Sequence, residues 1–518
     1  MNSSHLHGHS IIAGKVVAGT GPTFHAVNPG TSEKLAPDFH SATRADADRA
    51  LQAAAAAFAE YRRLPAETRA RFLDTIAAEI EALGETLLAR VQAETGLPPA
   101  RLQGERARTC NQLRLFAEVI REGSWADRRI DVALPERKPL PRPDLRRVLL
   151  PLGPVVVFGS SNFPLAFSVA GGDTASALAA GCPVVVKGHS AHPGTSELVA
   201  GAITKAVKHC GLPPGVFSLI QGARDIGIAL VEHPATAAVG FTGSYTAGRA
   251  LLEAAAARPH PIPVFAEMSS LNPVFLRPDA LRTRGTEIAQ GLLGSFTMGV
   301  GQLCTKPGLV FALRSPETDT FLISLGTLIS TPPCATMLTD KIHQAYASNR
   351  AVVLKIPGVT LAASSEIAPH STKTEAQPSF AHTTAAYFLK NPAVATEVFG
   401  PFTVIVLAES EEEILACARA LEGQLTATLH ATEADLAAIE PLVSILEQKA
   451  GRLVFNAFPT GVEVSSAMNH GGPWPATSDV RFTSVGTAAI LRFARPVCYQ
   501  GFPQSLLPPA LRDKNSAS

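Results

Sequence analysis

Short apolar runs alternate with helix-forming segments through the middle of this chain, and that alternation most limits the fold it can adopt. The runs Val155–Phe158 and Pro183–Lys187 flank a glycine- and alanine-rich stretch at 170–180. Valine-rich runs are typical of strands buried on both faces of a parallel sheet, so the three segments predict a βαβ unit. The alternation continues with a helix and two strands expected at 196–209, 216–220 and 237–241. The sequence therefore predicts an α/β fold with a doubly wound sheet.

A second alternation of apolar runs begins after residue 264. Its strands are expected at Val274–Leu276, Val352–Leu354, Val404–Val406 and Leu453–Phe455. A chain of 518 residues is too long for one ordinary core, so two or three domains are expected. The segment 127–150 contains many prolines and arginines and is expected to be extended, as a linker or a protruding arm.

Composition limits the partners and the location. The formal net charge is +1, so no basic field predicts a nucleic-acid or anionic-membrane partner. The seven cysteines include no C-x-x-C pair, which argues against a disulfide framework and against a bound metal. The first nine residues lack the regions of a signal peptide, and no apolar run is long enough for a membrane span. We therefore expect a cytoplasmic protein, with a disordered tail at 514–518.

One cysteine, Cys304, lies in the glycine-containing segment Gly299–Gly308, and the carboxylate of Glu267 precedes it in the chain. A catalytic thiol reacts as its thiolate and needs a nearby base. Glycines around it permit a substrate carbonyl to approach closely. The alternative is that Cys304 is a buried structural residue, as free cysteines often are. We predict that Cys304 is a nucleophile and that Glu267 is its base.

Other segments occur in an order that resembles the NAD(P)-dependent aldehyde dehydrogenase superfamily over nearly the whole chain. They are the turn Ser161–Pro164, the strand-end residue Lys187, the turn Phe241–Ser244 and the motif Glu397–Pro401. The resemblance implies a Rossmann-type cofactor domain, a second α/β catalytic domain and a small oligomerisation arm. It also implies an enzyme that oxidises an aldehyde to a carboxylate.

Two segments depart from the commonest pattern of that family, namely Ala266–Pro273 and Gln302–Gly308. Both are similar to the branch that contains α-ketoglutaric semialdehyde dehydrogenases and some NADP-linked long-chain aldehyde dehydrogenases. The segments Phe163–Thr174 and Arg495–Gln500 resemble the former group. The resemblance therefore favours α-ketoglutaric semialdehyde (2,5-dioxopentanoate) as the substrate, with a medium- or long-chain aliphatic aldehyde as the alternative.

The resemblance also assigns catalytic roles. Cys304 would attack the aldehyde, and the side-chain amide of Asn162 with the backbone N–H of Cys304 would hold the oxyanion. Glu267 would then activate the water that hydrolyses the thioester. Asn162 taken alone is equally typical of a turn residue. Release of the thioester to CoA, and a non-catalytic binding or structural role, are the alternatives to hydrolysis.

Cofactor-binding residues follow from the same resemblance. Lys187 and Glu397 would hold ribose hydroxyls, and Phe399 would pack beside the nicotinamide. Gly243 and Ser244 would open a helix whose N-terminal N–H groups favour a pyrophosphate. Without the family, Lys187 reads as a solvated strand-end lysine and Gly243 as a strand terminator.

The preference between NADP and NAD depends on Ser190. NAD-preferring relatives often carry glutamate at this position, and a carboxylate there would repel the 2′-phosphate that a serine can bind. Arg224 follows Gly222–Ala223, where a cation is placed to stack on adenine or to pair with that phosphate. We therefore predict NADP over NAD.

The resemblance divides the chain into three parts. Residues 1–126 and 151–264 would bind NAD(P), residues 265–484 would form the catalytic domain, and residues 127–150 and 485–505 would form the arm. Because relatives assemble through such an arm, a homodimer or homotetramer is expected.

Overall fold

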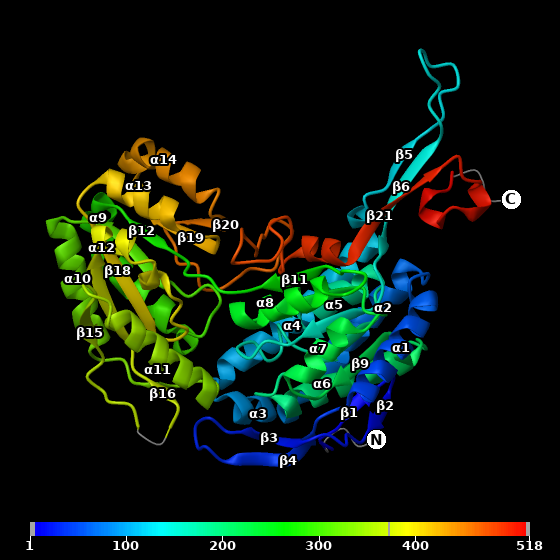
Figure 1. The fold of residues 1–518 in the computed structure, drawn as a ribbon, viewed down its shortest axis with the longest axis horizontal. Helices are drawn as coiled ribbons and strands as arrows, with labels where there is room; N and C mark the ends of the chain where they lie inside the picture. The colour runs from blue at the N-terminus through cyan, green and yellow to red at the C-terminus, as the bar shows by residue number, and fades with distance from the viewer. Residues whose placement is uncertain (1–5, 371–372, 514–518) are drawn as a thin grey trace.

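Two seven-stranded sheets divide the molecule into two lobes, and the cyan hairpin of a third sheet projects beyond them (Figure 1). The structure is a computed structural model that describes residues 6–370 and 373–513. The disorder expected for 514–518 therefore lies outside the described residues. Within those ranges, no helix has both the length and the apolar character needed to cross a membrane.

The first lobe is built on a sheet of order β11-β10-β7-β8-β9-β1-β2. The strands β11, β10, β7, β8 and β9 are parallel, as the valine runs predicted, whereas β1 pairs antiparallel with β9 and β2. The strand bounds are Ser10–Ile12 (β1), Lys15–Val17 (β2), Val155–Phe158 (β7), Val184–Lys187 (β8), Phe217–Ile220 (β9), Ala238–Thr242 (β10) and Val264–Glu267 (β11).

Helices cover both faces of this sheet. Val155 and Val157 point into one apolar cluster and Val156 into another, and all three are buried. Because successive side chains of a strand point to opposite faces, a continuous valine run is what a sheet covered on both sides requires. The helices are α1 (Arg44–Tyr61), α2 (Ala66–Ala82), α3 (Gly84–Thr95), α4 (Pro99–Glu122), α5 (Gly172–Ala180), α6 (Pro193–His209), α7 (Arg224–Glu232) and α8 (Tyr245–Ala256).

The second lobe has a sheet of order β15-β17-β18-β13-β12-β19-β20, parallel except for the edge strand β15. Its strands are β12 (Val274–Leu276), β13 (Leu309–Leu313), β15 (Thr360–Ser364), β17 (Ser379–Thr384), β18 (Phe402–Ala408), β19 (Gln424–His430) and β20 (Ala450–Phe455). Its helices are α9 (Pro278–Thr297), α10 (Pro316–Ile329), α11 (Asp340–Leu354), α12 (Ala385–Lys390), α13 (Glu411–Ala420) and α14 (Leu436–Leu446).

The strand predicted at Val352–Leu354 is wrong, because these residues form the last turn of α11. Thr339 caps that helix by accepting a hydrogen bond from the backbone of Ile342, and the helix continues unbroken from there. Of the run, Val353 is fully buried and Val352 is half exposed, which fits one face of a helix. Three adjacent apolar residues do not distinguish a strand from the end of a helix.

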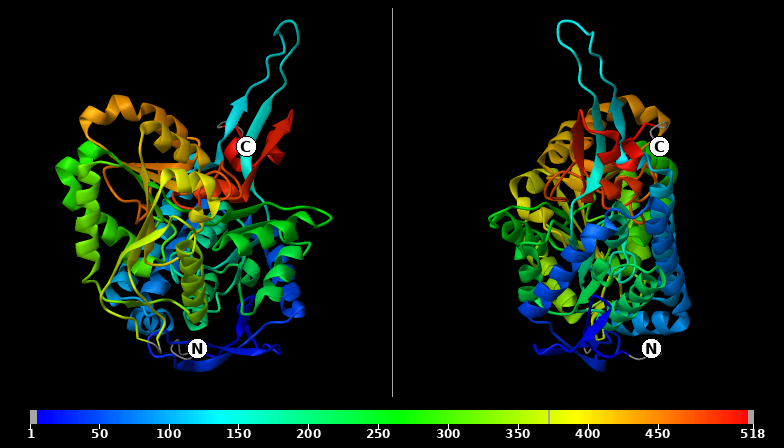
Figure 2. Two further views of the ribbon diagram at one scale, coloured as in Figure 1. Left: turned by 60° about the vertical axis from the view of Figure 1, so that its left-hand side comes forward. Right: turned by 90° about the vertical axis from the view of Figure 1, so that its right-hand side faces the viewer.

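The projecting hairpin belongs to a three-stranded antiparallel sheet of order β21-β6-β5. The strands are β5 (Arg129–Asp131), β6 (Leu145–Pro151) and β21 (Ala494–Gln500), and Figure 2 shows the hairpin extending away from both lobes in two views. Two smaller sheets pair β3 (Thr23–Val27) with β4 (Lys34–His40), and β14 (Ala335–Thr336) with β16 (Glu375–Ala376). These sheets agree with the three-part division expected from the sequence, whose limits stay a prediction.

Candidate active site

Cys304 follows a strained turn at the end of α9. Gly299, Val300 and Gly301 all adopt positive φ angles, of 58°, 60° and 65°. A β-branched residue such as valine rarely adopts this conformation, which costs about 1–3 kcal/mol and persists only where surrounding structure enforces it. A Cβ atom on Gly301 would lie 2.2 Å from the backbone of Gly400. The turn therefore presses the cysteine segment against the motif Glu397–Pro401.

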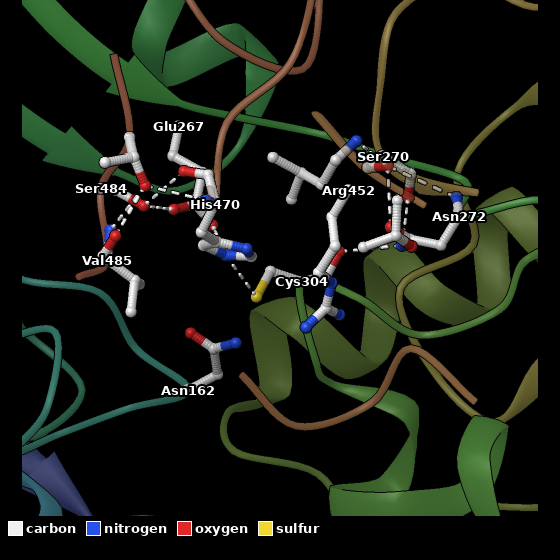
Figure 3. A network of polar contacts seen from close by, with 12 residues as sticks. Asn162, Glu267, Ser270, Asn272, Cys304, Arg452, His470, Ser484 and Val485 are labelled. Atoms are coloured by element: carbon white, nitrogen blue, oxygen red, sulfur yellow. Dashed lines mark hydrogen bonds and ion pairs between the residues drawn. The ribbon is translucent and has the colours of Figure 1, made fainter. Parts of the chain in front are cut away.

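Asn272 fixes the backbone on the other side of the thiol (Figure 3). Its Nδ2 donates to the carbonyl oxygens of Cys304 and Lys306, at 2.9 and 3.0 Å. Its Oδ1 accepts from the hydroxyls of Ser270 and Thr426, each at 3.0 Å. Asn272 is fully buried and has a φ of 48°, which asparagine tolerates better than most residues. The half-buried Cys304 is thus held by a satisfied network.

His470 joins the thiol to Glu267 (Figure 3). Its Nε2 lies 3.5 Å from Sγ of Cys304 and 2.9 Å from Oε1 of Glu267. The other oxygen of Glu267 accepts from the hydroxyl of Ser484, which also donates to the carbonyl of His470 at 3.1 Å. Glu267 comes from the end of β11 in the first lobe, whereas Cys304 belongs to the second. The site therefore assembles where the lobes meet.

Burial and charge oppose each other at this pair. Burial alone lowers the pKa of His470, but the charges of Glu267 and Cys304 outweigh it and raise that pKa to about 10. Burial raises the pKa of Glu267, but His470 and Ser484 outweigh this effect and lower the pKa below its usual range. The pair is thus stabilised as imidazolium and carboxylate beside the thiol. One side-chain atom from each of Glu267, Cys304 and His470, of a type that can bind a metal ion, lies within 4.8 Å of the other two.

Asn162 lies near the thiol, on the side away from Asn272, in the loop between β7 and α5 (Figure 3). Its Nδ2 donates to the carbonyl of Gln302 at 3.0 Å, which leaves its second N–H for another acceptor. The backbone carbonyl of Asn162 accepts a hydrogen bond from Arg101 of α4 at 2.7 Å. The structure thus brings together Asn162, Glu267 and Cys304, the three residues predicted to be catalytic.

The residues predicted to bind the cofactor surround one edge of the first sheet. The chain runs from β7 outward to β8 and β9, then returns to β10 on the other side of β7. The carboxyl ends of β7 and β10 thus form a switch point, where open α/β sheets bind nucleotides. Lys187 ends β8, and the exposed Ser190 follows it; the equally exposed Arg224 begins α7.

The turn after β10 has the features of a phosphate site. Gly243 is exposed, and its N–H donates to the carbonyl of Glu267 at 3.0 Å. Ser244 caps α8, accepting from the backbone of Ala247 at 3.4 Å. Thr242, at the end of β10, has a buried hydroxyl without a partner among the described residues. The exposed start of a helix and an unpaired hydroxyl beside it fit a bound pyrophosphate.

Glu397 and Phe399 lie in the loop before β18, which the buried Lys306 holds in place. Nζ of Lys306 donates to the carbonyls of Val398 and Phe402, at 3.0 and 2.9 Å. Burial lowers the pKa of Lys306 to about 8, against the effect of Glu397. Burial raises the pKa of Glu397, against the effects of Ser269 and Lys306. Lys306 therefore connects the thiol segment to the loop predicted to bind the nicotinamide ribose.

Sequence reasoning missed His470, and it quoted Asn272 and Lys306 only as parts of motifs. His470 precedes Gly471–Gly472 but is 166 residues from Cys304 and 203 from Glu267. Its one local signal is a histidine before a glycine pair, which by itself is not specific. Asn272 and Lys306 occupy the two segments that depart from the common family pattern, and those departures were the signal.

Comparisons with known proteins agree with this geometry. Residues 16–474 match the model of the aldehyde dehydrogenase family. The chain is 53% identical to alpha-ketoglutaric semialdehyde dehydrogenase 2 of Azospirillum brasilense, over 98% of this chain and 97% of that protein. It is 49% identical to the alpha-ketoglutaric semialdehyde dehydrogenase of Acinetobacter baylyi, over 99% and 97%. A betaine aldehyde dehydrogenase of Staphylococcus aureus in complex with NAD+ has the same fold, with a TM-score of 0.81 and 21% identity over 96% and 98% of the chains.

Proposed function

The chain belongs to the aldehyde dehydrogenase family, whose members oxidise aldehydes with NAD(P), and from that premise we propose that it oxidises α-ketoglutaric semialdehyde to 2-oxoglutarate. The observation that carries the chemistry is the contact chain Cys304–His470–Glu267, with distances of 3.5 and 2.9 Å. Two relatives that cover nearly the whole chain support the substrate. Per turnover, the aldehyde and one water become the carboxylate, a hydride carries away two electrons and one hydrogen nucleus, and two protons are released.

In the proposed first step Cys304 attacks the aldehyde carbon. His470 stabilises the thiolate, because its ring is held charged beside Sγ. The free N–H of Asn162 and the backbone N–H of Cys304 are proposed to hold the oxyanion that forms. Lys187 and Glu397 would hold the ribose hydroxyls of the dinucleotide and Phe399 would pack beside its nicotinamide, which would supply the hydride acceptor when bound.

In the second step water hydrolyses the thioester. Both oxygens of Glu267 are already engaged, by His470 and by Ser484. Glu267 therefore acts together with His470, whose Nε2 lies between the carboxylate and the sulfur. A carboxylate oxygen keeps a free lone pair beside each hydrogen bond, so Glu267 accepts the water proton while the charged ring of His470 holds the carboxylate in place. This arrangement favours hydrolysis over transfer of the acyl group to CoA.

Initial rates test the proposal. We would compare α-ketoglutaric semialdehyde with pentanal, an uncharged aldehyde of the same chain length, beside a Cys304→Ala control. A higher kcat/KM for the semialdehyde, lost in the control, is expected. A preference for pentanal would keep the chemistry and overturn the substrate, whereas CoA-dependent turnover would overturn the hydrolytic step.

For the cofactor we propose NADP over NAD. The exposed Ser190 brings no negative charge to the ribose 2′ position, and the exposed Arg224 begins a helix on the neighbouring strand connection. A Ser190→Glu variant is expected to lower kcat/KM for NADP about 100-fold and to change the value for NAD far less, because the new carboxylate repels the 2′-phosphate. A wild-type preference for NAD in the same assay would contradict the proposal.

We also propose a homodimer or homotetramer in the cytoplasm. The projecting hairpin supports the assembly, because four of its apolar residues are left exposed by the part of the chain that the structure describes: Ile130, Val132, Leu134 and Leu140. All seven cysteines are unpaired thiols, which agrees with a reducing compartment.

A further inference from the structure

Three arginines interact electrostatically with Cys304, and two of them, Arg101 and Arg452, donate to backbone carbonyls. Arg101 donates to the carbonyl of Asn162 at 2.7 Å. Arg452 of β20 donates to the carbonyl of Gly461 at 3.1 Å. The third, Arg108 of α4, has its Nε and Nη2 buried and without a hydrogen-bond partner among the described residues. A buried donor without a partner is uncommon and indicates a place where a ligand can bind.

The unpaired atoms of Arg108 form one edge of the guanidinium. Two other arginines of the chain use the corresponding Nε and Nη2 edge to bind a carboxylate with two parallel hydrogen bonds. Nε and Nη2 of Arg121 donate to Glu67 at 2.9 and 3.0 Å, and those of Arg481 donate to Asp479 at 2.9 and 2.6 Å. Two N–H groups in this fixed geometry match the two oxygens of a carboxylate. Arg108 thus presents an unused carboxylate-binding edge.

The ring contacts of Arg108 place it beside the catalytic loop. Its guanidinium lies 5.9 Å from the ring centre of Phe163 and 5.4 Å from that of Phe167. Phe163 directly follows Asn162, the residue proposed to hold the oxyanion. Burial lowers the pKa of Arg108, against the electrostatic effects of Cys304, Glu105 and Glu267. The cation therefore lies near the reacting atoms, in a fixed orientation.

Glu105, one turn before Arg108 on α4, acts on the charge of Arg108 but makes no hydrogen bond to this edge. Its Oε1 accepts from the backbone N–H groups of Leu165 and Ala166, at 2.8 and 3.0 Å. The carboxylate thereby anchors the turn that contains Phe163 and Phe167. Arg101, Glu105 and Arg108 follow one another at i, i+4 and i+7, so one face of α4 supports the whole catalytic loop.

The remaining surroundings of the two rings are apolar. Phe163 and Phe167 pack in a small cluster with residues from the other lobe and the C-terminal region: Val462, Val464, Met468 and Val485. Val485 directly follows Ser484, which contacts Glu267. Arg101 also lies 5.0 Å from the ring centre of Phe163 but donates to Asn162, so Arg108 is the cation that offers an unpaired edge beside this apolar wall. Such a site suits a short aliphatic chain that ends in a negative charge.

We propose that the Nε and Nη2 edge of Arg108 binds the carboxylate of the substrate and so selects aldehydes that carry one. This inference rests on the proposed function and deepens it. In α-ketoglutaric semialdehyde, four carbon–carbon bonds separate the carboxylate carbon from the aldehyde carbon. In the proposed pose the aldehyde lies at Cys304, the methylene groups pack against Phe163 and Phe167, and the carboxylate pairs with the guanidinium of Arg108.

The first test measures selectivity in the full-length enzyme. We would determine kcat/KM for α-ketoglutaric semialdehyde and for pentanal in the wild type and in Arg108→Met, Arg108→Lys and Arg114→Met. The ratio of the two values should fall about 100-fold in Arg108→Met, mainly through KM, because two charge-assisted hydrogen bonds are lost. Arg108→Lys should retain part of this ratio, because it keeps the positive charge. Arg114 lies on the same helix but pairs with Glu81 at the surface, so Arg114→Met should keep the ratio.

The second test does not require the semialdehyde to be the substrate. The probe is 2-oxopentanoate, which has a methyl group in place of the aldehyde and cannot be oxidised, as an inhibitor of pentanal oxidation. Competitive inhibition in the wild type and in Arg114→Met, with an inhibition constant raised about 100-fold in Arg108→Met, is expected.

Each outcome has one meaning. The role of Arg108 would be overturned if Arg108→Met lowered kcat/KM for both substrates by the same factor, or left the inhibition constant of 2-oxopentanoate unchanged. This holds even if the wild type prefers the semialdehyde. Inhibition that depends on Arg108 in an enzyme that does not prefer the semialdehyde would overturn the proposed substrate and keep the carboxylate site. If Arg108→Met does not fold, Arg108→Lys decides, since an unchanged ratio and an unchanged inhibition constant in that variant would contradict bidentate binding.

Discussion

At the scale of the residue, His470 and His430 are both almost fully buried, yet their pKa values move in opposite directions. Burial lowers the pKa of a histidine because the charged ring loses its hydration. At His430 burial prevails, with a contribution from Arg284, and the pKa falls to about 4. At His470 the negative neighbours prevail, and the pKa is raised.

Glutamine at each position should therefore change the melting temperature with opposite pH dependence. The raised pKa of His470 stabilises the fold fully below the unfolded value of 6.5, and this stabilisation is lost as the pH rises towards about 10. The lowered pKa of Glu267 also stabilises the fold, at pH values above its unfolded pKa of 4.5. His470→Gln should thus cost about 3 kcal/mol between pH 4.5 and 6.5 and progressively less in alkali.

His430→Gln is the matched control. Its lowered pKa stabilises the fold above pH 6.5, and this stabilisation is lost as the pH falls through about 4. Thermal unfolding of both variants across pH 4.5–9.5 checks the prediction. Equal effects of His470→Gln at pH 6 and pH 9 would count against the charged pair.

A second prediction at this scale concerns the two asparagines with positive φ, the buried Asn272 and the exposed Asn456. In Asn272→Asp the donor to the carbonyls of Cys304 and Lys306 becomes an acceptor, so the thiol segment should shift and kcat should fall at least about 10-fold. Asn456 has a φ of 53° and donates to Ala431, far along the chain from the thiol. Asn456→Asp should leave kcat within a factor of about two; equal losses in both variants would contradict the prediction.

At the scale of the element, one buried lysine joins the thiol segment to the loop before β18. Without the ammonium group of Lys306, the carbonyls of Val398 and Phe402 lose their donor, and the loop that carries Glu397 should become less ordered. Lys306→Met is therefore expected to raise the KM for the dinucleotide about 10-fold. Lys390→Met, at the exposed end of α12, is the control. An unchanged KM in Lys306→Met would show that the lysine has no part in cofactor binding.

At the scale of the whole molecule, the projecting sheet is the surface proposed to form the assembly. Leu140 near its tip is 70% exposed, and Ile323 on α10 is 71% exposed in the second lobe. Leu140→Asp should shift the protein towards smaller species in analytical ultracentrifugation, because a charge is then buried in the interface. Ile323→Asp should keep the sedimentation coefficient. Retention of the wild-type coefficient in both variants would contradict assembly through the hairpin.

The sequence by itself determined the class of fold, the strands β7 to β10 of the first sheet and the strands β12, β18 and β20 of the second, and it singled out the thiol and the carboxylate that the site brings together. These features leave local traces, because a strand buried on both faces needs a continuous apolar run and a reactive cysteine needs an open backbone. The sequence misplaced one strand at Val352–Leu354 and left β11, β13, β15, β17 and β19 unpredicted. Only the tertiary structure placed His470 between Cys304 and Glu267, and left the edge of Arg108 unpaired. Such contacts join residues from different lobes, and periodicity along the chain carries no record of which side chains meet after folding.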